Sequence, residues 1–140
     1  MNKRTPISAI MTKDVITLDH TDNLLTAERL FKKHKIRHIP ITKGDHIFGM
    51  LSYTDLLRIS FADASEDKYS SADSTIYNLF TIEQIMAKKP VTVSSLATIK
   101  EVAEILSKKE FHALPVVDKT NLVGIITTTD LINYLIKQYN

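Results

Sequence analysis

Two stretches of the sequence decide the fold: HIFGMLSYTDLL at residues 46–57 and NLVGIITTTDLI at residues 121–132. The second begins 75 residues after the first, and both place a glycine, two short apolar runs and a Thr-Asp pair at the same positions. Comparing the whole chain with itself at this offset gives 11 identities over the 51 positions from Ile7 to Leu57, without a gap. The chain therefore contains an internal repeat.

Each copy of the repeat is about 50 residues long, which is near the lower limit of size for independent folding. One unit of a repeat protein usually cannot bury its own apolar face. We therefore expect the two copies to pack on each other and to form one module.

Composition narrows the class of protein. Of the 140 residues, 44% are hydrophobic, which is enough for a core of ordinary size. The apolar runs are far shorter than the roughly 20 residues that span a bilayer, and the N-terminus has no signal-peptide pattern. The chain has no cysteine and a formal charge of only +2, so disulfides are excluded and nucleic acid is not expected as the main partner. We expect a cytoplasmic protein.

Both copies predict the same order of elements: helix, strand, helix, strand, strand, helix. Pro6 suits a first helical turn, and Thr81 with Gln84 matches a capping box. Asn23 and Thr98, again 75 residues apart, are the expected N-caps of amphipathic helices. We expect leading helices at 5–11 and 81–86, strands at 15–18, 38–42, 47–52, 91–94, 113–117 and 122–127, and closing helices from residues 54 and 129.

Residues 61–75 separate the two copies. They are rich in Ser, Ala and Asp and are expected to form a mobile linker loop. The apolar run IYNLF at residues 76–80 is expected to begin the second leading helix. The predicted organisation is a first repeat at 1–60, a linker at 61–75 and a second repeat at 76–140.

The motifs of the two copies resemble those of a known family. Each copy has a strand that begins with the pattern x-h-Pro, His38-Ile39-Pro40 and Ala113-Leu114-Pro115, and later the pattern Gly-h-h-Ser/Thr-x-x-Asp, where h is hydrophobic. Together they resemble a tandem pair of cystathionine-β-synthase (CBS) domains, called a Bateman module. The resemblance implies an α/β (α+β) fold with two β-α-β-β-α repeats packed with pseudo-two-fold symmetry. The chain length leaves no room for an attached enzyme or channel domain, so we expect a stand-alone module.

The resemblance also implies a function. CBS pairs bind adenosine-containing ligands in two clefts between the repeats: AMP, ADP, ATP, S-adenosylmethionine, NAD or cyclic di-AMP. We expect a non-enzymatic regulatory module for an adenine nucleotide (AMP, ADP or ATP), for example in energy sensing, that signals to a partner protein. The expected ligand-binding residues are Val15, Ile16, Arg37, His38, Ile39, Pro40, Ser52, Thr54, Asp55, Pro90, Val91, His112, Ala113, Leu114, Pro115, Thr127, Thr129 and Asp130.

The aspartates at the start of the closing helices are the strongest of these candidates. An ionised carboxylate such as that of Asp55 or Asp130 can accept two ribose hydroxyls side by side. Ser52 and Thr127 offer a hydroxyl three residues earlier, and the helix start at Thr54 and Thr129 offers backbone N–H groups to phosphate. The alternative is that Ser/Thr-x-x-Asp is a capping box, which requires no ligand.

The resemblance implies that the clefts are crossed. Asp55 is expected to share a cleft with Pro90, Val91 and 112–115, and Asp130 to share one with Val15, Ile16 and 37–40. Arg37 and His112, three residues before the prolines, are expected to meet the phosphates, with Lys35 and His38 as possible helpers. Arg37 carries a permanent charge, whereas His112 is charged only when protonated. The alternative for Arg37 is a solvated position at a helix C-terminus.

Other chemistry has weaker support. His34 and His38 are four residues apart, but no HExxH motif or cysteine set accompanies them, so we expect no metal site. No Gly-rich phosphate loop, nucleophile elbow or carboxylate pair indicates catalysis. Two rival interpretations stay open, a constitutive scaffold with empty clefts and an enzyme that acts on the nucleotide.

The terminal helices predict a homodimer. Apolar residues in the leading and closing helices exceed what one small partner repeat should cover. CBS pairs commonly dimerise into a flat disk through such helices, so the resemblance implies the same. The expected interface residues are Ile7, Ile10, Met11, Leu131, Ile132, Leu135, Ile136 and Tyr139.

Overall fold

The chain is a mixed α+β protein, here described from a computed structural model that covers residues 3–64, 77–109 and 111–139. Its elements follow the predicted order in both repeats, with one added two-residue strand, β4. They are η1 (Ile7–Ala9), β1 (Leu18–Asp19), α1 (Leu24–His34), β2 (His38–Lys43), β3 (His46–Ser52), α2 (Tyr53–Ala64), α4 (Ile82–Ile85), β4 (Ala87–Lys88), β5 (Val93–Ser94), α5 (Ile99–Lys108), β6 (Ala113–Asp118), β7 (Asn121–Thr127) and α6 (Thr128–Lys137).

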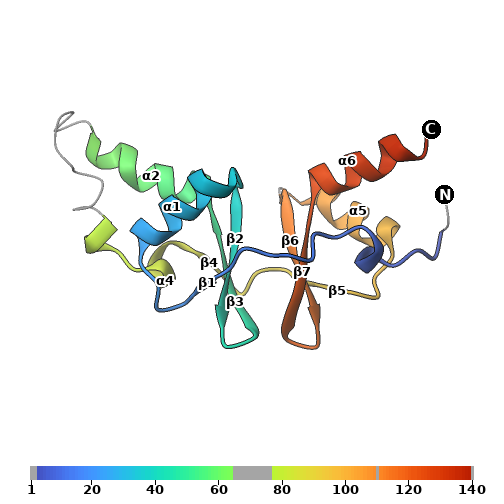
Figure 1. The fold of residues 1–140 in the computed structure, drawn as a ribbon, viewed down its shortest axis with the longest axis horizontal. Helices are drawn as coiled ribbons and strands as arrows, with labels where there is room; N and C mark the ends of the chain where they lie inside the picture. The colour runs from blue at the N-terminus through green and yellow to red at the C-terminus, as the bar shows by residue number, and fades with distance from the viewer. Residues whose placement is uncertain (1–2, 65–76, 110, 140) are drawn as a thin grey trace. The chain divides into compact units, whose positions relative to one another are not determined.

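The elements form two compact units. Unit 1 contains Met1–Val15, Asp45–Ile47 and Pro90–Asn140, and unit 2 contains Ile16–Gly44 and Phe48–Lys89. In unit 1, α5 and α6 lie on one side of the β6–β7 hairpin, and in unit 2, α1 and α2 lie on one side of β2 and β3 (Figure 1). Each unit thus places a two-helix layer against its strands.

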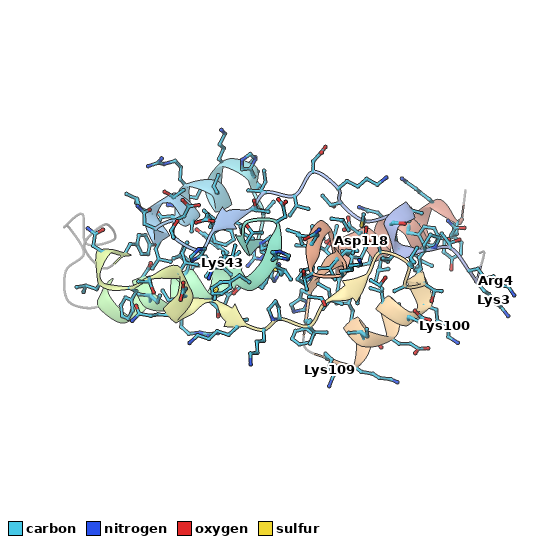
Figure 2. The ribbon with its side chains drawn as sticks, turned by 90° about the horizontal axis from the view of Figure 1, so that it is seen from below. Lys3, Arg4, Lys43, Lys100, Lys109 and Asp118 are labelled. Carbon is cyan, nitrogen blue, oxygen red and sulfur yellow. The ribbon has the colours of Figure 1, made fainter. Side chains whose placement is uncertain are left out.

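Strand pairing is alike in the two units. In unit 1, β5 runs parallel to β6, and β6 pairs antiparallel with β7 from Ala113↔Thr127 to Asp118↔Asn121. In unit 2, β1 runs parallel to β2, and β4 pairs antiparallel with β3. Lys43 and Asp118, labelled in Figure 2, occupy equivalent repeat positions and are the last residues of β2 and β6, just before the two hairpin turns. The hairpin predictions are confirmed.

The leading segment of each repeat completes the core built on the strands of the other repeat. Ile7, from the first repeat, is completely buried in the core of unit 1. Ile82, from the second repeat, is completely buried in the core of unit 2. The expectation that Ile7 contributes to an outer interface is therefore wrong, because its side chain lies inside the core of unit 1. Ile10 and Met11 are partly buried and pack against the same core.

Backbone pairing explains why the first leading helix is shorter than predicted. Only Ile7–Ala9 are helical, in a single 3-10 turn. The Thr12 N–H, which would bond the Ser8 carbonyl if an α-helix continued, donates to the Ile125 carbonyl at 2.9 Å instead.

The predicted helix starts are confirmed elsewhere. The capping box of Thr81 and Gln84 forms, and Asn23 and Thr98 cap α1 and α5. Residues 77–79 are helical but are separated from α4 by Phe80 and Thr81. The helix α2 continues to Ala64, and residues 65–76, most of the expected linker, lie outside the described residues.

A close backbone approach explains the two repeated glycines. In unit 1, Thr12 and Ile125 exchange two N–H···O hydrogen bonds of 2.9 Å, which brings the leading segment onto β7. A Cβ on Gly124 would lie 2.5 Å from the Met11 sulfur and 3.0 Å from the Thr12 carbonyl oxygen. Gly49 is covered by the Met86 side chain in the same way in unit 2. Only glycine leaves room for this approach.

We expect Gly124→Ala to lower the free energy of unfolding by about 1 to 3 kcal/mol, the usual range for an overpacked core position. Denaturant unfolding of the purified protein measures this. The matched control is Met11→Ala, alone and combined with Gly124→Ala. Because the clash involves the Met11 side chain, the double variant should lose less stability than the two single losses together. Simple additivity of the two losses would contradict the contact.

Candidate functional site

Asp130 lies in the first turn of α6 and is held by three polar groups. The Thr127 N–H donates to Asp130 Oδ2 at 3.1 Å, and the Asp130 N–H donates to Thr127 Oγ1 at 3.1 Å. The Thr12 hydroxyl lies 3.4 Å from both carboxylate oxygens. The first pair is a complete capping box. Asp130 is therefore fixed in orientation while its side chain remains half-buried.

Asp55 begins α2 in a different environment. Its N–H donates to Ser52 Oγ at 3.0 Å, which is one half of a capping box. In the described part of the chain its carboxylate does not accept the Ser52 N–H and instead contacts Arg58 Nη1 at 3.3 Å. The Arg58 side chain is 75% exposed, so this ion pair contributes little to stability.

The offset of 75 residues identifies one cause of this difference. The position that corresponds to Thr12 is Ala87, which has no hydroxyl to offer to Asp55. Sequence reasoning missed Thr12, because its partner in the repeat carries no matching group. Only the bridge between Thr12 and Ile125 brings it within reach of Asp130.

The backbone ties each closing helix to the segment before the proline strand. The Tyr53 N–H donates to the Arg37 carbonyl at 2.8 Å in unit 2, and the Thr128 N–H donates to the His112 carbonyl at 3.0 Å in unit 1. The side chains of Arg37 and His112 are exposed. Each unit therefore presents an aspartate-bearing helix start next to a basic residue of its own strand layer.

The predicted site residues are divided between the units. Unit 1 holds Val15, Pro90, Val91, His112, Ala113, Leu114, Pro115, Thr127, Thr129 and Asp130, whereas unit 2 holds Ile16, Arg37, His38, Ile39, Pro40, Ser52, Thr54 and Asp55. Each predicted crossed cleft combines residues of unit 1 with residues of unit 2, and the two units are described one by one. The crossed pairing stays a prediction.

Burial separates the predicted contacts into two kinds. Ile39 and Leu114 fill the cores of units 2 and 1, so their side chains serve packing whether or not a ligand binds. Thr54 and Thr129 are exposed at the starts of the closing helices, and Val91 is 42% exposed. Exposure therefore leaves these three residues accessible to a ligand, whereas Ile39 and Leu114 are not.

The described residues offer neither a metal-binding cluster nor a membrane-spanning helix. No group of three or more His, Cys, Asp or Glu side chains in the described ranges is arranged to hold a metal ion. None of the helices formed by these residues is long and apolar enough to cross a bilayer.

Comparison with known proteins identifies relatives over almost the whole chain. Protein MJ1225 of Methanocaldococcus jannaschii is 26% identical over 129 residues, which are 91% of this chain and 46% of that protein. An inosine-5′-monophosphate dehydrogenase of Korarchaeum cryptofilum is 28% identical over 120 residues, which are 85% of this chain and 22% of the enzyme. The chain thus spans half or less of the length of these curated relatives.

Solved structures agree with this comparison. The crystal structure of MJ1225 matches with a TM-score of 0.82 at 26% identity, covering 96% of this chain and 49% of that one. The CBS domain pair of protein MJ0100, solved in complex with 5′-methylthioadenosine and S-adenosyl-L-methionine, matches with a TM-score of 0.76 at 26% identity, covering 94% and 99%. The sequence of the chain matches the CBS domain family at residues 7–62 and a second time at residues 82–137. The chain therefore belongs to the CBS domain family and contains a pair of CBS domains.

Proposed function

We propose that this CBS pair is a non-enzymatic regulatory module that binds an adenosine-containing ligand, of the AMP, ADP and ATP class, in crossed clefts between its repeats. Ligand binding would favour one arrangement of the module and so change its interaction with a partner protein. CBS pairs are generally regulatory modules, and MJ1225 has been proposed as an archaeal homolog of γ-AMPK.

The observation that carries the proposal is the unused acceptor capacity of Asp130. A carboxylate offers about four lone-pair positions. The Thr127 N–H and the Thr12 hydroxyl occupy part of this capacity, and they also fix the orientation of the side chain. Two acceptor positions remain for the two hydroxyls of a ribose.

Asp55 supports the proposal by a different route. A helix cap would explain an aspartate whose carboxylate bonds the N-cap backbone, but Asp55 contacts the exposed Arg58 instead. Capping by its carboxylate therefore does not account for this residue. Binding of ribose does, and MJ0100, which matches at 26% identity, is solved with two adenosine compounds.

A scaffold without ligand is the second candidate function. The complete capping box at Thr127 and Asp130 favours it, because this contact alone gives Asp130 a role in stability. The two candidates differ in what they require of the aspartates, and substitutions can separate them.

We propose homodimerisation through the outer face of α6. Ile132, Leu135 and Ile136 are spaced at i, i+3 and i+4 on α6 and form one exposed apolar stripe, and the exposed Tyr139 follows in the turn after the helix. Ile132 is 55% exposed and Tyr139 is 83% exposed, whereas Leu131 packs against the core of unit 1. A single self-complementary stripe suits a two-fold axis, on which the same residues of both copies meet.

The ligand proposal predicts a rise in melting temperature. At a ligand concentration 100 times the dissociation constant, one site stabilises the protein by about 2.7 kcal/mol. For a domain of this size this corresponds to roughly 5 to 10 °C. Thermal unfolding with AMP, ADP, ATP, S-adenosylmethionine and cyclic di-AMP measures the shift, with GMP as the control for the base. If no adenosine compound shifts the melting temperature at millimolar concentration, the sensor proposal is wrong.

Conservative substitution of the aspartates separates ribose binding from capping. Asp55→Asn and Asp130→Asn keep the size of the side chain but remove its charge. We expect each change to weaken binding at its own cleft by about 1.5 to 3 kcal/mol, the range for a charged hydrogen bond. The stability of the ligand-free protein should hardly change, since asparagine still accepts one hydrogen bond. Titration calorimetry measures the affinity, and lost stability with unchanged affinity would instead support the scaffold.

The dimer proposal predicts a mass of twice 15.9 kDa in light scattering at micromolar concentration. We expect Leu135→Asp to return the mass to that of one chain, because it places a charge in the apolar stripe. Gln138→Asp adds the same charge to an exposed neighbouring position and should leave the dimer intact. A wild-type mass of 15.9 kDa would rule out the dimer.

A further inference from the structure

A pocket of about 260 Å³ lies between η1 and α6, entirely within unit 1. The residues from α6 are spaced at i, i+3, i+4 and i+7 from Asp130 and therefore share one face of the helix. This polar face is distinct from the apolar stripe that contains Leu135. The lining residues are Ala9, Ile10, Asp130, Asn133, Tyr134 and Lys137.

Several residues that line the pocket differ from those at the equivalent positions of the repeat. Ala9 corresponds to Gln84, whose longer side chain is held in the capping box of α4. Asn133 corresponds to Arg58, whose side chain reaches back to its own aspartate. The surroundings of Asp130 therefore have shorter side chains at these two positions than the surroundings of Asp55.

Lys137 gives this pocket a positive charge that the first repeat lacks. The corresponding position in the first repeat is Ala62. Lys137 is exposed, and its ammonium group forms no ion pair with any residue that the structure describes. It is free to neutralise an anion that enters the pocket.

The dimensions of the pocket suit one part of a nucleotide. Its volume of about 260 Å³ is below the range of roughly 300 to 1,000 Å³ that encloses a whole drug-sized ligand. The helical rise places the backbone of Lys137 roughly 10 Å from that of Asp130. Asp130 accepts hydroxyls at one end, the Asn133 amide can donate and accept between them, and the Lys137 ammonium donates at the other end. A sugar with an anionic substituent matches this order of groups.

We propose that the pocket between η1 and α6 holds the ribose and 5′-phosphate of the ligand, with Asp130 on the ribose hydroxyls and Lys137 on the phosphate. This inference rests on the proposed function and narrows its ligand class to nucleoside 5′-phosphates at the Asp130 site. The ribose keeps the phosphate away from the Asp130 carboxylate. S-adenosylmethionine would bring a sulfonium cation toward Lys137, and 5′-methylthioadenosine would bring no charge to it.

Titration calorimetry with AMP, adenosine and S-adenosylmethionine tests the assignment. We expect wild type to bind AMP more tightly than adenosine or S-adenosylmethionine. Lys137→Gln should weaken AMP at this site by at least about tenfold, the lower end for loss of a charged hydrogen bond, and leave adenosine unchanged. Lys137→Arg should retain AMP affinity. Ala9→Gln, which installs the side chain of the equivalent residue Gln84 of the second repeat, should weaken AMP by narrowing the pocket.

The matched control is Lys100→Gln on α5, labelled in Figure 2, which removes one positive charge from the same unit away from the pocket. It should leave AMP affinity unchanged. If Lys100→Gln weakens AMP as much as Lys137→Gln does, the loss of affinity comes from net charge alone and the inference is overturned.

If Lys137→Gln binds AMP as wild type does while Arg37→Gln does not, the phosphate lies at Arg37. The inference is then wrong and the proposed function stands. Tighter binding of S-adenosylmethionine than of AMP also overturns the inference alone. If no adenosine compound binds wild type, the proposed function and the inference both fail.

Discussion

The approach of a leading segment to a bare glycine in the hairpin is the contact on which each unit depends. In unit 1 it consists of the paired hydrogen bonds between Thr12 and Ile125 and of the Met11 side chain over Gly124. A side chain at the glycine would separate the two backbones and break this pairing. The same contact lets Ile7 enter a core formed by residues more than 80 positions away, such as Val93. The steric requirement for glycine at one position of the hairpin thus decides which distant segment packs on it.

This contact also connects the core to the candidate site. The segment that packs on Gly124 carries the Thr12 hydroxyl to Asp130, 118 residues away in sequence, and places Ala9 opposite α6. A ligand between η1 and α6 would touch the leading segment and the helix that follows β7. It would therefore stabilise the association of the leading segment with unit 1, and a ligand can shift a protein only through such differential contacts. The leading segment is thus the part of unit 1 that would transmit ligand binding to other parts of the chain.

Most secondary structure could be predicted because its signals are local. The N-caps at Asn23 and Thr98 and the two hairpins depend on residues within a few positions of each other, and the repeat doubled each signal. The location of Ile7 could not be predicted. Apolar spacing indicates that a side chain is buried in a core or in an interface, but it does not indicate which core. The 5–11 helix was overestimated for the same reason, since the Thr12 N–H bonds to the Ile125 carbonyl of a distant strand instead of continuing the helix. In the site, Asp55 and Asp130 were found by their repetition, whereas Thr12 was missed because Ala87 does not repeat it.

The distribution of identities and differences between the repeats separates the needs of folding from those of binding. Gly49 and Gly124 are identical, and both meet a requirement of the backbone that any ligand would leave unchanged. The positions around the two aspartates differ instead: Asp130 has the Thr12 hydroxyl and Lys137 nearby, whereas Asp55 has the Arg58 guanidinium. At Asp55 the Arg58 guanidinium contacts the carboxylate itself and would compete with a ribose for its oxygens. At Asp130 the Lys137 ammonium belongs to a residue two helical turns away, where it would leave the carboxylate open and favour a negative charge beyond the sugar. Two helix starts of the same backbone design therefore offer different ligand chemistry, and the two sites should not be equivalent.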